Sequence, residues 1–240
     1  KGHIYALCGE NGTGKSTLAD ALKGRLDAEI YTGKDFLRLA KHEAEAKKLF
    51  QEKLQAAKAA IEKVAAPGVK VMYLAGDAGD EEFVKKAVDT VTGPDGLGGC
   101  DILVNSQGIN KKMWSWEIET DFFEKMLHTN ITSLMLTCKY FGNWMKDHNL
   151  DGDEYVELQP GQPNTNKGYG KIINIGSVRG IRAVANGGGG NVPYNTTKGA
   201  VEMLTKAYAA DLRPNVQVNA IGPTITYTPM MVGILPPDEN

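Results

Sequence analysis

The sequence predicts an α/β fold in which helices cover a mainly parallel, doubly wound sheet. Short apolar runs alternate with helical patterns along all 240 residues, and a strand–helix–strand order requires crossover connections between parallel strands. The later apolar runs are continuous, which is typical of strands buried on both faces. No internal repeat or linker interrupts this order, so we expect a single domain over residues 1–240.

The chain opens with an apolar run at residues 4–8, which predicts a buried strand. A glycine-rich turn at residues 9–14 follows, and we expect a helix from there to about Leu26. Residues 28–31 are a second short apolar run and predict a second strand. This order is typical of the start of a nucleotide-binding sheet.

A long helix is expected over residues 35–66, which are rich in Ala, Lys, Glu and Leu, residues of high helix propensity. Pro67 and Gly68 end this helix, because both residue types interrupt helical structure. The third strand is then predicted at residues 69–74, and the next helix at residues 81–91.

The second half of the chain continues the alternation. Strands are predicted at residues 101–105, 171–175 and 216–220, and helices at residues 120–146 and 194–212. Polar residues follow several of these strands, and a Rossmann-like sheet binds its ligands at the carboxyl ends of the strands. Between two of these elements, residues 147–169 are polar and rich in Gly, Pro and Asn, so we expect a surface insertion there.

Composition narrows the class of protein. A net charge of −2, a hydrophobic content of 42% and a mean hydropathy of −0.31 indicate a soluble globular protein with no electrostatic affinity for nucleic acid. No apolar run approaches the length of a membrane span, so no membrane partner is expected. Cys8, Cys100 and Cys138 form no metal-ligand pattern, and we expect reduced thiols, no bound metal and a cytoplasmic location.

The segment from Gly9 to Ser16 fits the P-loop pattern G-x-x-x-x-G-K-[ST]. Glycines at 9, 12 and 14 allow backbone N–H groups to close around phosphate oxygens, and a helix N-terminus favours negative charge. Lys15 adds a positive charge, and Ser16 is able to bind magnesium. The pattern predicts a phosphate-binding turn, whose ligand is either ATP or GTP or the pyrophosphate of a dinucleotide.

Tyr194 and Lys198 lie four residues apart at the start of an expected helix, so both side chains lie on one helix face. A nearby ammonium group favours the ionised phenol, and we therefore expect Lys198 to lower the pKa of Tyr194. A phenol with a lowered pKa exchanges protons near neutral pH. With Ser177 upstream, the pair is predicted to form an active site.

Several segments resemble the short-chain dehydrogenase/reductase family, and they occur in the family's order. The resemblance runs from about residue 69 to residue 230, with a looser match over residues 2–35. Its motifs are Asp77 in Ala-Gly-Asp, the run Asp101-Ile-Leu-Val-Asn-Ser-Gln-Gly108, Asn130, Ser177 at the end of Asn-Ile-Gly-Ser, Tyr194 with Lys198, and the segment from Asn219 to Met230.

The resemblance implies an oxidoreductase that interconverts a carbonyl and a secondary alcohol by hydride transfer with a nicotinamide cofactor. In that case Tyr194 exchanges the proton with the substrate oxygen, and Lys198 assists it and holds the nicotinamide ribose. Ser177 orients the substrate, and Asn130 holds a water molecule for proton relay.

The resemblance also implies a cofactor site. Asp77 corresponds to the family's adenine-binding aspartate, and the loop after Pro223 corresponds to the segment at the nicotinamide. Lys34 stands where NADP-using members often carry Arg, so NADP is predicted, and Asp35 beside it makes NAD the alternative. The implied cofactor-binding residues are Gly9, Asn11, Gly12, Thr13, Gly14, Lys34, Asp77, Ala78, Asn105, Ser106, Gly108, Tyr194, Lys198, Pro223, Thr224, Thr226 and Thr228.

The sequence departs from the family pattern in its first turn, which is one residue shorter than T-G-x-x-x-G-x-G and has the P-loop form. Gln107 also stands where the family has Ala, and Thr224 where it has Gly. Two other functions therefore remain open: a P-loop ATP-binding protein or small-molecule kinase, and a catalytically silent scaffold of the same fold.

The resemblance further implies a homodimer or homotetramer, because the family pairs the helices that correspond to those beginning at Thr120 and Tyr194. The expected substrate is a small carbonyl compound or alcohol. Gln107 and Asn110 favour a sugar or polyol over a steroid, because amide side chains hydrogen-bond to hydroxyl groups.

Overall fold

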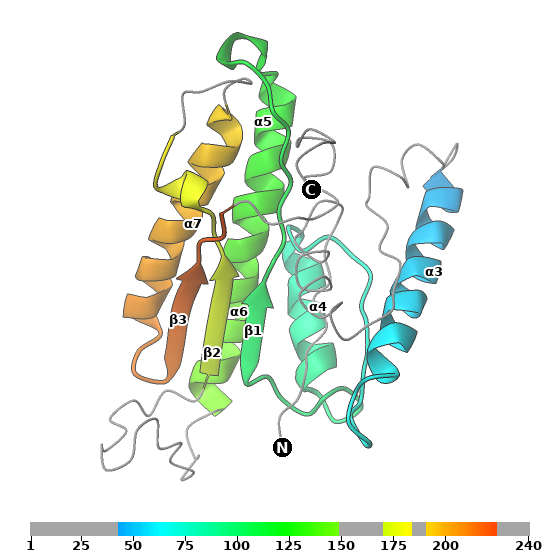
Figure 1. Cartoon of the computed structure of the whole chain (residues 1–240). Helices are drawn as coiled ribbons and strands as arrows, with labels where there is room; N and C mark the ends of the chain where they lie inside the picture. The colour runs from blue at the N-terminus through cyan, green and yellow to red at the C-terminus, as the bar shows by residue number, and fades with distance from the viewer. Residues whose placement is uncertain (1–42, 149–169, 184–190, 225–240) are drawn as a thin grey trace.

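Among the residues that the structure describes, a three-stranded parallel sheet lies at the centre (Figure 1). The computed structural model describes residues 43–148, 170–183 and 191–224, and side chains from residue 51 onward. The strands are β1 (Ile102–Asn105), β2 (Gly170–Ile175) and β3 (Val216–Ile221), in the order β1-β2-β3. All three run parallel, so their carboxyl ends lie at one edge of the sheet. This arrangement confirms the predicted Rossmann-like α/β class.

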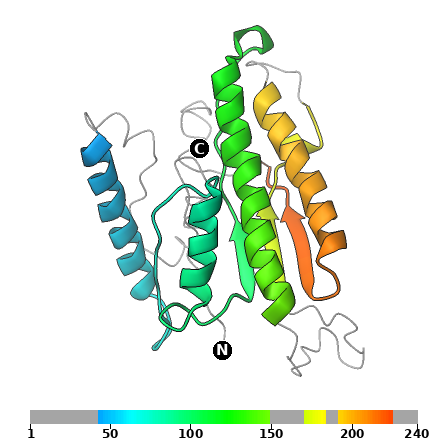
Figure 2. The same ribbon diagram turned by 180° about the vertical axis from the view of Figure 1, so that it is seen from behind.

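Helices cover one face of this sheet. The helices in chain order are α3 (Glu43–Glu62), α4 (Glu81–Thr92), α5 (Thr120–Leu127), α6 (Ser133–His148) and α7 (Val192–Asp211). Seen from behind, α4, α6 and α7 lie side by side over the strands, and α3 stands beyond α4, away from the sheet (Figure 2). Among the described residues, the helices therefore lie on one face of the sheet only. The continuous apolar runs of the strands, by contrast, predict helices on both faces.

The predicted helix over residues 120–146 contains an irregular turn. Between α5 and α6 lies the π-helical turn His128–Thr132, in which the hydrogen bonds span five residues rather than four. Ser133 N, at the end of this turn, donates to His128 O. The turn places Thr129 and Asn130 in the protein interior, between the flanking helices. Such turns occur frequently at functional sites.

The core lies between the sheet and helices α6 and α7. The buried residues Gly170, Ile172 and Asn174 of β2 alternate with exposed or half-buried neighbours, so every second residue of the strand is buried. Ile172 and Met145 of α6 are completely buried. A β-carbon on Gly142 of α6 would lie 2.7 Å from Leu212 Cδ1, so the absence of a side chain there lets α6 pack closely.

A buried polar network crosses this apolar core. Asn105 of β1 and Asn174 of β2 are register partners, and Asn105 Nδ2 donates to Asn174 Oδ1 at 2.8 Å. Asn174 Nδ2 donates to Thr205 Oγ1 of α7 at 3.0 Å, and Thr137 Oγ1 of α6 donates to Asn105 Oδ1 at 2.8 Å. The thiol of Cys138 lies beside both amides, and burial raises its pKa to about 12. The network joins two strands to the two helices that cover them.

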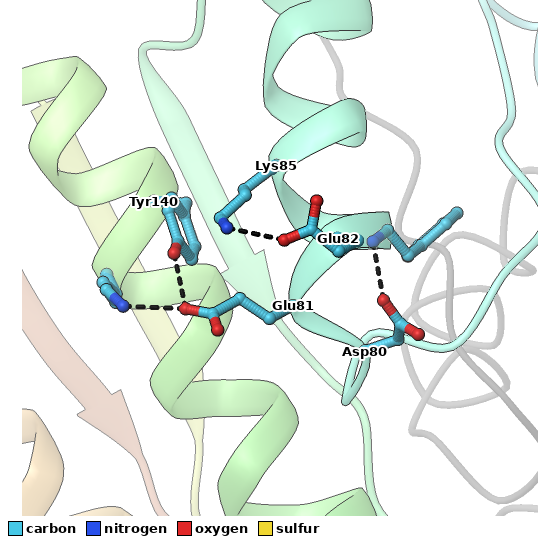
Figure 3. A network of polar contacts seen from close by, with 7 residues as sticks. Asp80, Glu81, Glu82, Lys85 and Tyr140 are labelled. Carbon is cyan, nitrogen blue, oxygen red and sulfur yellow. Dashed lines mark hydrogen bonds and ion pairs between the residues drawn. The ribbon is translucent and has the colours of Figure 1, made fainter.

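A second polar network lies on the surface between α4 and α6 (Figure 3). Glu81 Oε1, in the first turn of α4, accepts from Lys139 Nζ at 2.8 Å and from the hydroxyl of Tyr140 on α6. These two hydrogen bonds lower the pKa of Glu81 to about 2, and the hydrogen bond with Lys139 has the larger effect. Lys85 pairs with Glu82 one turn along at 2.6 Å. All of these groups face water, so salt screens their attraction, and the network orients α4 more than it stabilises the fold.

The strand predicted over residues 69–74 is wrong, because the structure has no strand in this segment. An apolar run permits a strand, but a strand also needs a neighbour, and in the described part of the sheet β1 pairs with β2 alone. The strands near the sequence predictions 101–105, 171–175 and 216–220 are confirmed, as is the helix at 81–91. The predictions for residues 4–8, 28–31, the first helix and most of the insertion at 147–169 lie outside the described residues.

The described residues contain neither a membrane-spanning helix nor a metal-binding cluster. None of the helices in that part of the chain is both long and apolar enough to cross a membrane. Within the same residues no group of His, Cys, Asp and Glu side chains is placed to hold a metal ion.

Candidate active site

The loops after β2 and β3 meet at the carboxyl edge of the sheet. Ser177 follows β2 by two residues, and Pro223 follows β3 by two residues. Val178 N donates to Pro223 O at 3.2 Å, and Gly176 N donates to Ile221 O at 2.8 Å. These backbone hydrogen bonds hold Ser177 at the edge where such sheets bind their ligands.

Ser177 is buried beside the first turn of α7. Its hydroxyl oxygen accepts from Arg179 N at 3.2 Å, which begins the short 3-10 helix Val178–Gly180. A β-carbon on Gly180 would lie 2.5 Å from Lys198 O, so the lack of a side chain there lets this turn rest directly on α7. Ser177 thereby lies close enough to Tyr194 to act on the pKa of its phenol.

Tyr194 lies in the first turn of α7, which Pro193 helps to start because its fixed φ suits the first helical positions. Burial raises the pKa of the phenol, and a hydrogen bond from Ser177 and the charge of Arg179 act in the opposite direction. The prediction that Lys198 lowers this pKa is therefore wrong for this arrangement: burial disfavours the phenolate more than the nearby charges favour it.

Lys198 is 5% exposed and lies one turn beyond Tyr194. Its Nζ donates to Ile175 O, at the end of β2, at 2.7 Å, and lies 5.7 Å from the centre of the Tyr194 ring. Burial lowers the pKa of this ammonium to about 8, against a small opposing effect of Glu202. The four-residue spacing brings the side chains of Tyr194 and Lys198 together, as predicted. The lysine, however, donates its hydrogen bond to the end of β2 rather than to the phenol oxygen.

The buried ammonium of Lys198 makes stability depend on pH. Its pKa is about 8 when folded and 10.5 when unfolded, so the unfolded chain binds more protons between these values and stability rises with pH there. The quantity to compare is the unfolding free energy of the Lys198→Met variant minus that of the parent. We expect this difference to fall by about 2 kcal/mol between pH 8 and pH 10, because only the parent gains stability from Lys198 over that range. Urea titrations at pH 8 and pH 10 measure this difference. The titration of the cysteines and tyrosines contributes equally to both proteins and therefore cancels in the difference. A constant difference would show that Lys198 titrates as in the unfolded chain.

Asn130 joins three segments from its position in the π-helical turn. Its Oδ1 accepts from Ile109 N at 2.7 Å, and its Nδ2 donates to Ile109 O at 3.1 Å and to Thr197 Oγ1 at 2.9 Å. A β-carbon on Gly108 would lie 3.4 Å from Asn130 Oδ1 and 3.7 Å from Lys198 Nζ. Asn130 therefore fastens the loop after β1 to α7, directly beside the lysine.

The other described residues predicted on the cofactor side lie in three places. The Asn105 side chain is engaged in the core network, so only its backbone is available to a ligand, and Ser106 beside it is buried. Asp77 accepts from Gly79 N through Oδ1 at 2.7 Å and lies 2.8 Å from His128 Nε2 through Oδ2, while Ala78 is buried. Pro223 is half-buried and Thr224 is exposed. The remaining residues, Gly9, Asn11, Gly12, Thr13, Gly14, Lys34, Thr226 and Thr228, lie outside the described residues.

Three residues of the site were not identified from the sequence. Thr197 lies between Tyr194 and Lys198, so its position in the motif was an available signal. Arg179 likewise follows Ser177 by two residues. His128 gives no such signal, because it is 51 residues from Asp77 and only the fold brings the two together.

Comparisons with known proteins agree with this geometry. A family model described as short chain dehydrogenase matches residues 36–238. Carbonyl reductase family member 4 of Danio rerio is 30% identical over 169 residues, which cover 70% of this chain and 60% of that protein. L-xylulose reductase of Mesocricetus auratus is 28% identical over 165 residues, or 68% of this chain and 55% of that protein.

The chain is also similar to solved structures. The crystal structure of NAD+-bound xylitol dehydrogenase resembles this chain with a TM-score of 0.60 and 28% identity, covering 75% of this chain and 60% of that chain. The chain therefore spans about 60% of the length of the relatives that it matches.

Proposed function

The chain belongs to the short-chain dehydrogenase family, and we propose that it interconverts a carbonyl and a secondary alcohol with a nicotinamide dinucleotide. One observation carries this proposal. A serine, a tyrosine and a buried lysine meet at the carboxyl edge of a parallel sheet. A buried phenol beside groups that favour its ionised form is suited to exchange a proton with a substrate oxygen.

Each residue of the proposed site has one task. Tyr194 transfers the proton at its hydroxyl oxygen, and Ser177 holds the substrate oxygen. Lys198, whose Nζ lies 5.7 Å from the centre of the Tyr194 ring, holds the nicotinamide ribose. Asn130 keeps the loop after β1 against α7, which keeps Gly108 and Lys198 adjacent. The dinucleotide supplies or accepts the hydride.

The described residues fit a dinucleotide. Gly108 leaves open the space that a β-carbon would fill beside Lys198 Nζ, so a ribose can approach the ammonium. The Asp77 carboxylate is 44% exposed and retains lone pairs for an adenine amine beside its contact with His128. NADP is the proposed cofactor because of Lys34, and NAD is the alternative because of Asp35.

The P-loop kinase remains the competing proposal. The pattern from Gly9 to Ser16 favours it, but a kinase leaves the convergence of Ser177, Tyr194 and Lys198 without a purpose. A silent scaffold is the third candidate, in which the altered first turn no longer binds a dinucleotide.

Binding measurements separate these three functions. Trp114 and Trp116 form an exposed stacked pair in the loop after β1, with ring centres 5.0 Å apart, and Trp144 stacks on His148. We expect NADPH, and more weakly NADH, to quench this fluorescence, and ATP with magnesium to leave it unchanged. Quenching by ATP alone would support the kinase, and no response to any nucleotide would support the scaffold. A panel of sugars, polyols and ketones with either cofactor then identifies the substrate.

The proposed enzyme works in the cytoplasm as a homodimer or homotetramer. Met203, on the outer side of α7, is 63% exposed, which supports contact between helices of two copies. Light scattering of the purified chain measures the assembly directly, and a monomer at micromolar concentration would exclude it.

A further inference from the structure

Four buried polar atoms in the described part of the chain have no hydrogen-bond partner. They are the amide atoms Gln107 Nε2, Asn110 Oδ1, Asn191 Oδ1 and Asn195 Oδ1. Buried polar atoms are almost always paired, because an unpaired one loses its bond to water without replacement. Four such atoms on two short segments therefore need a common explanation.

Two of the four amides share a helix face with the proposed catalytic pair. Asn191, Tyr194, Asn195 and Lys198 occupy positions i, i+3, i+4 and i+7 at the start of α7, and such positions form one stripe. The unpaired oxygens of Asn191 and Asn195 therefore flank the side chains proposed to carry out the chemistry.

The other two amides lie on the loop after β1, on either side of Gly108 and Ile109. Asn130 bonds both backbone polar groups of Ile109 and also Thr197 of α7, so this loop is fastened to the same helix. Gly108 itself lies beside Lys198 Nζ. The loop thus brings Gln107 and Asn110 to the same proposed site from the side of β1.

The polarity of these four atoms indicates which kind of ligand would form hydrogen bonds with them. Three are acceptors and one is a donor, so the missing partner must offer several donors and at least one acceptor. A hydroxyl group does both, and it also satisfies an amide whose oxygen and nitrogen are exchanged by rotation. A carboxylate or a phosphate dianion offers acceptors only and leaves the three oxygens unpaired.

We propose that Gln107, Asn110, Asn191 and Asn195 form a subsite that selects a polyhydroxylated substrate, a keto sugar or polyol, over an apolar ketone. This inference rests on the proposed oxidoreductase function. The hydroxyl groups of the cofactor ribose share the same chemistry, so the test must distinguish substrate from cofactor.

The test uses the full chain with NADPH and two ketones, L-xylulose and 2-pentanone, which have the same number of carbon atoms. Asn195→Ala and Asn110→Ala remove one amide from each segment, and alanine favours the helix at 195, so the variant keeps its fold. We expect KM for L-xylulose to rise roughly tenfold in each variant, with KM for 2-pentanone and for NADPH within twofold of the parent. Asn143→Ala, an exposed amide on α6, is the matched control and should change nothing.

A second measurement does not depend on turnover. Titration of the parent with xylitol in the presence of NADP+, followed by tryptophan fluorescence, should give saturable binding that each variant weakens by the same factor. Equal effects on both ketones, or a higher KM for NADPH alone, would assign the amides to structure or to the cofactor and overturn the proposal. A parent that reduces 2-pentanone but neither reduces L-xylulose nor binds xylitol would overturn it while leaving the oxidoreductase function intact. Absence of any nucleotide binding would instead refute the oxidoreductase function itself.

Discussion

Replacing Tyr194 with phenylalanine is expected to lower the turnover of carbonyl reduction by about 10²–10⁴-fold, the usual contribution of a positioned acid or base. The ring stays in place, so its packing at the start of α7 is kept, and only the hydroxyl near Ser177 is lost. The affinity for NADPH should remain within a few-fold, because the proposed ribose contact belongs to Lys198.

Initial rates with the best substrate of the panel measure this effect. Tyr140→Phe is the matched control, since the Tyr140 hydroxyl bonds Glu81 on the surface between α4 and α6 and lies outside the proposed site. A Tyr194→Phe protein that retains a tenth of the parental rate would remove the phenol from the reaction and leave Ser177 and Lys198 without their proposed function.

The second large effect concerns stability, at Asn174. This side chain is completely buried, accepts from Asn105 Nδ2 and donates to Thr205 Oγ1. Leucine has a similar size but no polar atoms, so Asn174→Leu leaves the amide of Asn105 and the hydroxyl of Thr205 with poorer partners inside the core. We expect a loss of about 2–4 kcal/mol in the free energy of unfolding, because each orphaned buried group costs about 1–3 kcal/mol.

Urea titration measures this loss, and a double variant sharpens the test. Asn219→Leu, at an exposed position of β3, serves as the control and should change stability little. Replacing Asn105 and Asn174 together by leucine removes both amides of the hydrogen bond between them. The double variant should therefore lose less unfolding free energy than the sum of the losses in the two single variants. Additive losses would mean that the two amides do not stabilise each other.

The order of elements in the second half of the chain was predictable because each signal there is local. The apolar run Ile172–Ile173 and the spacing of Tyr194 and Lys198 are both contained in a few residues, and the strand and the helix stripe follow from them. The segment 69–74 has an equally apolar run and forms no strand, because pairing depends on a neighbour that the run itself does not specify.

The interior of the site was less predictable. The amide of Asn130 bonds Ile109 and Thr197, which are 21 and 67 residues away in sequence, and nothing in the local sequence specifies these partners. The direction of the Tyr194 pKa shift was also wrong, because burial depends on the whole packing around α7 and the spacing argument considered one neighbour only. Contacts of this kind exist only after the chain has folded.

The π-helical turn at His128–Thr132 marks a place where the length of this helix can change by one residue. A π-helical turn holds one residue more than the α-helical turn that it replaces, so deleting one residue here would let α5 and α6 continue as one α-helix. The segments on either side would then keep their buried faces, including that of the fully buried Met126. What such a shortening would alter is the position of Asn130, and with it the hydrogen bonds to Ile109 and Thr197.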